Sequence, residues 1–170
     1  MLCAMEEMWP SAAGSQFEVA IEMLGSALRE CPEELWRERL WQDQTMPGFS
    51  EFWYVAYHTL FWLDLYLSGS REGFAPPAPF TLDELDPAGV LPPRVYTRDE
   101  LERYLAHSAE KCRETFKNLT DEQARRVHQI GSRGRTIRFA ELLLYNMGHV
   151  REHAAQLSMF LGQRRGLAST

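Results

Sequence analysis

Apolar positions along most of this chain recur every three or four residues, which is the period of an α-helix rather than of a strand. The first such stretch runs from Ser11 to about Glu30, with charged residues on its other side. The next begins after Ser50, a candidate N-cap, and runs to about Leu67. It is apolar nearly all round, which predicts a helix at the centre of the packing.

Two more long helices are expected in the second half of the chain. The sequence TRDE at Thr97–Glu100 is a capping box, so a helix should begin there and end near Asn118. A second capping box at Thr120–Gln123 predicts a short helix to about His128. The last helix is predicted over roughly Ile137–Leu161. We find no segment with the two-residue period of a half-buried strand, so no strand is predicted.

These elements predict an all-α fold, a four-helix bundle with short extra helices. Residues 71–96 separate the second long helix from the third and include six prolines, so they form a long crossover rather than a helix. A crossover at this place favours an up-down-down-up order of the four helices. Loops of this length inside a compact domain are usually functional. With 170 residues, 45% of them hydrophobic, residues 1–170 are expected to form a single domain.

The net charge of -6 argues against nucleic acid as a partner, because such proteins need a basic surface. Acidic residues outnumber basic ones in residues 1–120, whereas basic residues are in excess in residues 121–170. The surplus arginines are Arg125, Arg126, Arg133, Arg135, Arg138, Arg164 and Arg165. They form either a solvated face that balances the acidic half or a rim that recognises an anion, with Arg133, Arg135 and Arg138 the residues to test.

Cysteine usage and hydropathy predict a cytoplasmic protein. The chain has three widely spaced cysteines: Cys3, Cys31 and Cys112. An odd number without a CxxC pair indicates free thiols in a reducing compartment. The N-terminus lacks the pattern of a signal peptide. The most apolar run, residues 52–67, is shorter than the roughly 20 residues of a membrane span and contains His58 and Asp64, so no membrane partner is expected.

Two histidines lie four residues apart on the last predicted helix, His149 and His153. That spacing places both imidazoles on one helix face, where they can bind a single metal ion. Asn146 and Gln156 continue the same polar stripe between leucines. Buried polar groups need partners, and a bound ion is one way to provide them. Carbonyl groups or neighbouring side chains are the alternative.

His58 adds a third imidazole, because it lies in the apolar second helix and a bundle can bring that helix beside the fourth. Three protein ligands would leave coordination positions for water and substrate, as in catalytic metal sites. Asp64 is a weaker candidate, since it lies on another face of the helix. His107 and His128 do not fit this set, and we interpret both as surface residues.

Another interpretation of the same residues is an inverted zinc protease, because HVREH matches HxxEH with Glu152 as the general base. Those enzymes use a further acidic ligand downstream, and no Asp or Glu follows His153. The match is therefore interpreted as accidental, and Glu152 as a surface charge. A carboxylate-bridged di-iron site is not expected either, since no Glu-x-x-His motif occurs.

From about residue 15 to residue 162 the chain resembles the DinB-like (YfiT-like) superfamily of metal-dependent hydrolases. The resemblance rests on His58 in AYHTLFWLDLYL, on the proline-rich crossover and on GHVREHAAQLSMFLG near the C-terminus. It implies a four-helix bundle with a divalent metal, zinc or nickel, bound by His58, His149 and His153.

The resemblance also implies a range of functions. Relatives include thiol-S-transferases and isomerases that use low-molecular-weight thiols, so a small-molecule substrate and a thiol cofactor are expected, with transferase or hydrolase activity. The alternative is a bundle that binds a metal or small ligand without turnover, and no catalytic residue is assigned. Many relatives form homodimers, for which Trp9, Trp36 and Trp41 are candidate contacts.

Overall fold

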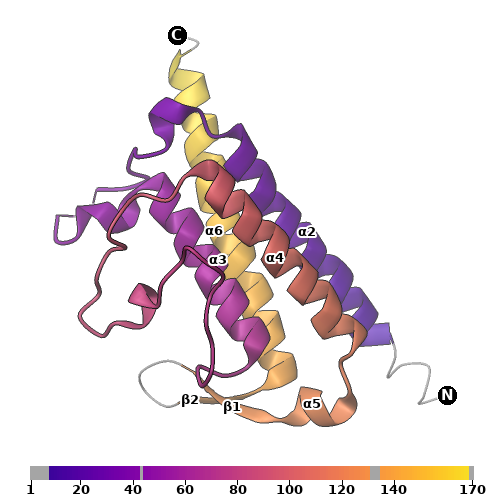
Figure 1. Ribbon diagram of the computed structural model, residues 1–170. Helices are drawn as coiled ribbons and strands as arrows, with labels where there is room; N and C mark the ends of the chain where they lie inside the picture. The colour runs from indigo at the N-terminus through magenta and orange to yellow at the C-terminus, as the bar shows by residue number, and fades with distance from the viewer. Residues whose placement is uncertain (1–7, 43, 131–134, 169–170) are drawn as a thin grey trace.

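The computed structural model describes residues 8–42, 44–130 and 135–168 (Figure 1). Four long helices form the predicted bundle: α2 (Met8–Glu30), α3 (Phe52–Ser68), α4 (Arg98–Lys117) and α6 (Phe139–Ala168). Helices α2 and α3 each pack against both α4 and α6. In Figure 1, α3 and α4 run in one direction and α2 and α6 in the other. The all-α fold is confirmed, and the helices follow the expected up-down-down-up order.

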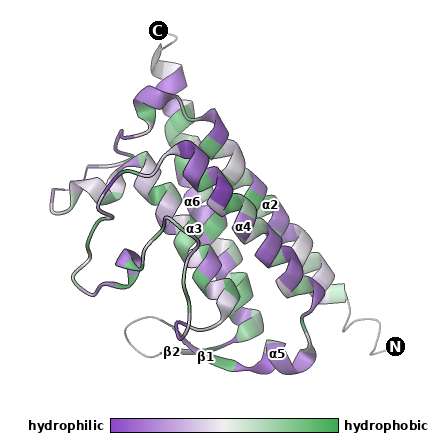
Figure 2. Ribbon diagram, viewed as in Figure 1, coloured by the Kyte–Doolittle hydropathy of each residue, from purple (hydrophilic) through white to green (hydrophobic). Residues whose placement is uncertain are grey.

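The burial of each helix follows from its sequence. Thirteen of the 17 residues of α3 are buried, as expected for a helix that is apolar nearly all round. In Figure 2, α4 carries both hydrophobic and hydrophilic residues. Five of its 20 residues are buried, and its hydrophilic side is exposed. The capping box that begins α4 is confirmed, because the Thr97 hydroxyl accepts from the Glu100 amide and the Glu100 carboxylate accepts from the Thr97 amide. Gly69 ends α3 with a φ of 70°, a conformation that glycine adopts without strain.

Short elements connect the long helices. They are η1 (Glu33–Leu35), η2 (Pro47–Ser50), η3 (Asp83–Leu85) and α5 (Asp121–Arg125). The predicted N-cap Ser50 is instead the last residue of η2, and its hydroxyl donates to the Pro47 carbonyl oxygen at 2.9 Å. Residue Glu51 precedes α3 without a side-chain cap. A 3-10 turn therefore takes the place of the expected cap.

The prediction that no strand is present was wrong. Strand β1 (Val127–Ile130) pairs antiparallel with β2 (Arg135–Arg138), and His128 lies opposite Ile137. His128 therefore lies in a strand rather than in the expected short helix, and Ile137 lies in β2 rather than at the start of the last helix. Strands of four residues are too short to display a period, and this pairing depends on hydrogen bonds between the two strands.

The last helix is also longer than predicted, since it continues beyond Leu161 to Ala168. Gly162 is exposed within it and does not end it. Glycine weakens a helix by only about 1 kcal/mol, so it lowers helix stability without requiring a stop.

The described cysteines agree with the prediction of free thiols. Cys31 and Cys112 are buried and form no disulfide, whereas Cys3 lies outside the described residues. Burial raises the pKa of both thiols to about 12, so neither is a nucleophile at neutral pH. Among the described residues, no helix combines the length and apolarity that crossing a membrane requires.

Candidate metal centre

Helices α3 and α6 bring the three predicted histidines together. His58 comes from α3, and His149 and His153 come from successive turns of α6. Each ring offers one nitrogen atom, and the three atoms lie within 4.8 Å of one another. The Nε2 atoms of His149 and His58 are 3.4 Å apart. Within the described part of the chain, no other group of His, Cys, Asp and Glu side chains has this geometry.

The second nitrogen of two of these rings is held by another side chain. The Nδ1 atom of His58 lies 2.8 Å from Glu84 Oε2, and Nδ1 of His153 lies 2.8 Å from Gln156 Oε1. Both partners are acceptors, so in a neutral ring Nδ1 carries the proton and Nε2 keeps its lone pair. The Nε2 lone pairs of His58 and His153 are then available to bind a cation. A cation at the centre would also stabilise the Nε2 atoms of His58 and His149, which face each other.

The electrostatics favour neutral rings at this centre. Burial, together with the neighbouring His153 and His58, lowers the pKa of His149 to about 3. Burial also lowers the pKa of His153. Both imidazoles are therefore neutral at pH 7, which is the form that binds metal ions.

Glu84 completes the centre and was missed by the sequence analysis. Its buried carboxylate accepts hydrogen bonds from His58 and, at 2.8 Å, from Trp62 Nε1. Burial raises the pKa of Glu84, but the bonds from His58, Tyr54 and Trp62 outweigh burial and lower it overall, which favours the ionised form. Glu84 lies in η3, inside the crossover that was predicted to be functional. Nothing local distinguishes it from the other acids there.

A pocket of about 410 Å³ adjoins this centre, a volume typical of small-molecule sites. Tyr54, His58 and Trp62 follow one another every four residues along α3 and form one wall. His153 reaches the pocket from α6, and the crossover closes another side. The lining residues are Trp41, Phe49, Tyr54, Val55, His58, Trp62, Asp83, Glu84, Gly89, Val90 and His153. The pocket wall is therefore mainly apolar and aromatic, with two carboxylates.

The arginine-rich segment lies away from the pocket. Arg125 and Arg126 form ion pairs with Asp121 and Glu122, each at 3.0 Å. Arg138 ends β2, 11 residues before His149, which corresponds to about 16 Å along a helix axis. Arg135 lies in β2, and Arg133 lies outside the described residues. None of the described arginines lines the pocket.

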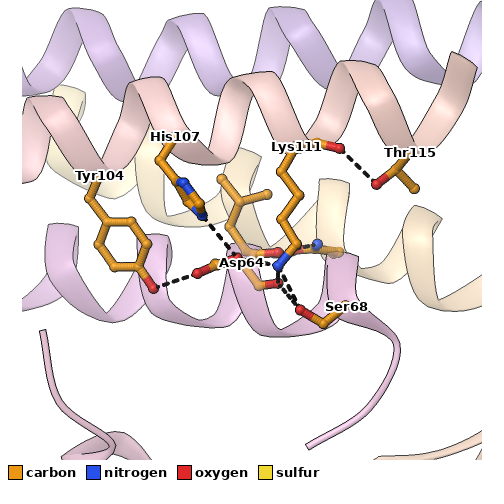
Figure 3. Close-up of polar contacts among 8 residues, drawn as sticks. Asp64, Ser68, Tyr104, His107, Lys111 and Thr115 are labelled. Carbon is orange, nitrogen blue, oxygen red and sulfur yellow. Dashed lines mark hydrogen bonds and ion pairs between the residues drawn. The ribbon is translucent and has the colours of Figure 1, made fainter. Parts of the chain in front are cut away.

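Asp64 is not positioned to be a fourth ligand. Figure 3 shows its carboxylate directed at α4, where it accepts hydrogen bonds from Tyr104 and Lys111. His107 is exposed, as predicted, and one of its ring nitrogens lies 3.8 Å from Asp64. His128 is only partly exposed, with its ring centroid 5.3 Å from that of Phe139, which corrects its assignment to the surface.

The remaining side chains singled out in the sequence have other surroundings. Glu152 is exposed, which agrees with its interpretation as a surface charge. Trp36 is buried and donates from Nε1 to the Tyr96 carbonyl oxygen at 2.9 Å, so it belongs to the core. Trp9 is partly buried, and Trp41 is exposed at the pocket.

Comparison with known proteins supports the family resemblance. A sequence model of the DinB superfamily matches residues 16–157, which include all three histidines and Glu84. No curated protein gives a significant match. No solved structure does so either. The family match covers most of the chain and agrees with the observed bundle, and the chain belongs to the DinB superfamily.

Proposed function

We propose that this protein binds one divalent metal ion through His58, His149 and His153 and acts on a small molecule held in the adjoining pocket. The observation that carries the proposal is the meeting of three ring nitrogens within 4.8 Å, beside a pocket of about 410 Å³. Neutral imidazoles suit zinc or nickel, the ions implied by the family resemblance. Three protein ligands would leave a coordination position for water or a substrate.

The proposed activity is that of a thiol-S-transferase or a hydrolase. A divalent ion bound there would lower the pKa of a thiol or a water and supply a nucleophile at neutral pH. Glu84 would fix the orientation of the His58 ring, and Gln156 that of His153. The apolar walls would exclude bulk water from the bound molecule.

A bundle that binds a metal or small ligand without turnover is the second candidate. One observation favours it: the pocket holds only two carboxylates, and Glu84 is already hydrogen-bonded to His58 and Trp62. Both bonds go to Oε2, so a general base among the carboxylates that line the pocket would be limited to Glu84 Oε1 or Asp83. An activity screen separates the two candidates.

The first test is the metal content of protein purified without an affinity tag, measured by elemental analysis. We expect about one divalent ion per chain, retained in His107→Ala and lost in His149→Ala. His107 is the matched control because it is exposed and outside the three-histidine group. A chain that binds neither zinc nor nickel when these are added would contradict the proposal. If the metal is bound, transfer of low-molecular-weight thiols to electrophiles is screened next with the metal-loaded protein.

A further inference from the structure

The pocket beside the histidines combines aromatic rings with negative charge, and no lysine or arginine of the described residues lines it. Four aromatic residues line it: Trp41, Phe49, Tyr54 and Trp62. Its two carboxylates are Asp83 and Glu84, and no lysine or arginine of the described residues contributes to its wall. This composition is the reverse of what an anionic ligand requires, because carboxylates repel it and no guanidinium or ammonium group pairs with it.

Trp41 leaves its ring available to a ligand. Its side chain is 43% exposed at the pocket, and among the described residues it stacks on no other aromatic ring and holds no cation. Val90, also exposed, lies on the same wall. Large apolar side chains exposed around a concave site are typical of ligand binding rather than of solvent contact. Trp62, by contrast, already has the Arg71 guanidinium 5.7 Å from its ring centroid.

Asp83 likewise has a charge that no described residue neutralises. Glu84 pairs with His58, whereas the Asp83 carboxylate accepts a hydrogen bond from the Thr81 hydroxyl and forms no ion pair within the described ranges. It is partly exposed and faces the same pocket as Trp41. An aromatic face and an unpaired carboxylate in one pocket are the two groups that recognise an organic cation.

We propose that this pocket binds a small organic cation, a protonated or quaternary amine. Its positive charge lies against Trp41 and Asp83, and a donor atom at its other end reaches the three-histidine centre. The donor end rests on the proposed function, since it requires a metal at that centre. The cation end does not, because its binding residues belong to the pocket wall. An organic cation takes the place of the anionic ligand that was one hypothesis for the arginine-rich segment. The described arginines of that segment do not line the pocket.

The test compares three thiols that share a two-carbon spacer and differ in terminal charge. They are thiocholine, its neutral isostere 3,3-dimethylbutane-1-thiol, and 2-mercaptoethanesulfonate. Their dissociation constants are measured by titration calorimetry with the full chain, both zinc-loaded and metal-free. We expect thiocholine to bind about tenfold more tightly than the neutral thiol in both forms, which is within the range of a cation–π contact. The sulfonate should bind most weakly.

Two variants assign the preference to the proposed residues. Asp83→Asn keeps the shape of the side chain, and Trp41→Leu removes the aromatic face. Each variant should lower the affinity for thiocholine to about the affinity for the neutral thiol. Asp86→Asn is the matched control, since Asp86 is an exposed carboxylate of the same crossover that does not line the pocket. Its preference should equal that of the wild type.

Equal affinity for the three thiols, preference for the sulfonate, or no binding at all would overturn the proposal. The zinc content of the same samples reports separately on the metal centre. A chain that holds zinc but shows no charge preference refutes the cation site alone. A chain that holds neither zinc nor nickel but still prefers thiocholine refutes the metal centre and supports the cation site.

Discussion

His58 presents Nε2 to the other two histidines because Glu84 accepts a hydrogen bond from its Nδ1 atom. A second acceptor, Gln156, has the same effect on His153. Side chains that orient a metal-binding imidazole and fix its tautomer are usually important for affinity. Among them, Glu84 is the more effective partner, since its buried carboxylate also strengthens the electron donation of the ring.

We therefore expect Glu84→Gln to weaken zinc binding about tenfold, the lower end of the effect of losing such a partner. The affinity is measured by competition with a chromogenic chelator. Glu72→Gln is the control, because Glu72 is an exposed residue of the same crossover outside the pocket. An affinity equal to that of the wild type would show that Glu84 does not support the metal centre.

The lowered pKa of His149 predicts how the metal-free protein responds to acid. The unfolded chain takes up a proton near the ordinary pKa of 6.5, whereas folded His149 does so only near its lowered pKa of about 3. The folded state therefore loses stability as the pH falls from about 6.5 toward 3. Above pH 6.5 the ring is neutral in both states, so its titration no longer changes the stability.

Substitution of the ring tests this response. His149→Leu should reduce the slope of unfolding free energy against pH by about 1.4 kcal/mol per pH unit near pH 5, the effect of one proton. The slope is obtained from urea unfolding in the presence of a chelator. Should wild type and variant show the same slope, the pKa of His149 is not lowered in the folded chain.

At the scale of elements, α3 and α4 are joined by a partly buried polar cluster (Figure 3). Asp64 is 1% exposed and accepts hydrogen bonds from Tyr104, at 3.1 Å, and from Lys111. The Lys111 ammonium also donates to the Ser68 hydroxyl at 2.6 Å. The two helices run parallel and are connected by the long crossover, so this cluster fixes their register where no short turn can.

Loss of Lys111 leaves the Asp64 carboxylate buried without a cation. We expect Lys111→Met to lower the free energy of unfolding by about 3 kcal/mol, the lower end of the cost when a buried charge is left without its partner. Exposed His107, at 3.8 Å from Asp64, provides the contrast: His107→Ala should change stability by about 0.5 kcal/mol or less. Both are measured by urea unfolding at pH 7, and equal effects would contradict this assignment.

At the scale of the whole molecule, the candidate centre joins three parts that are distant in sequence: α3, the crossover with Glu84, and α6. The unfolded chain does not hold these parts together. A ligand bound only by the folded state stabilises it in proportion to the logarithm of its concentration over the dissociation constant.

Zinc at about 100 times its dissociation constant should therefore add about 2.7 kcal/mol of stability. For a domain of this size, that raises the melting temperature by roughly 5 to 10 °C. Differential scanning calorimetry with and without zinc measures the shift, and His149→Ala should show none. If zinc does not change the melting temperature of the wild-type protein, a zinc centre formed on folding is refuted.

Local patterns in the sequence determined the four long helices, the capping boxes and the shared face of His149 and His153. These features depend on periodicity and on contacts within about four residues, which can be read directly from the sequence. His58 was added because it lies in the apolar second helix, which a bundle can bring beside the fourth. The family resemblance implied the same three histidines.

Tertiary structure alone decided which distant groups meet. Glu84 is 26 residues from His58, and His149 is 91 residues from it, so their contacts follow from how the crossover and α6 pack on α3. The same packing directs Asp64 at Lys111 and leaves Arg138 far from the pocket. The β1–β2 pairing likewise depends on hydrogen bonds between strands. Such contacts are set by the shape of the whole folded chain, which no local pattern encodes.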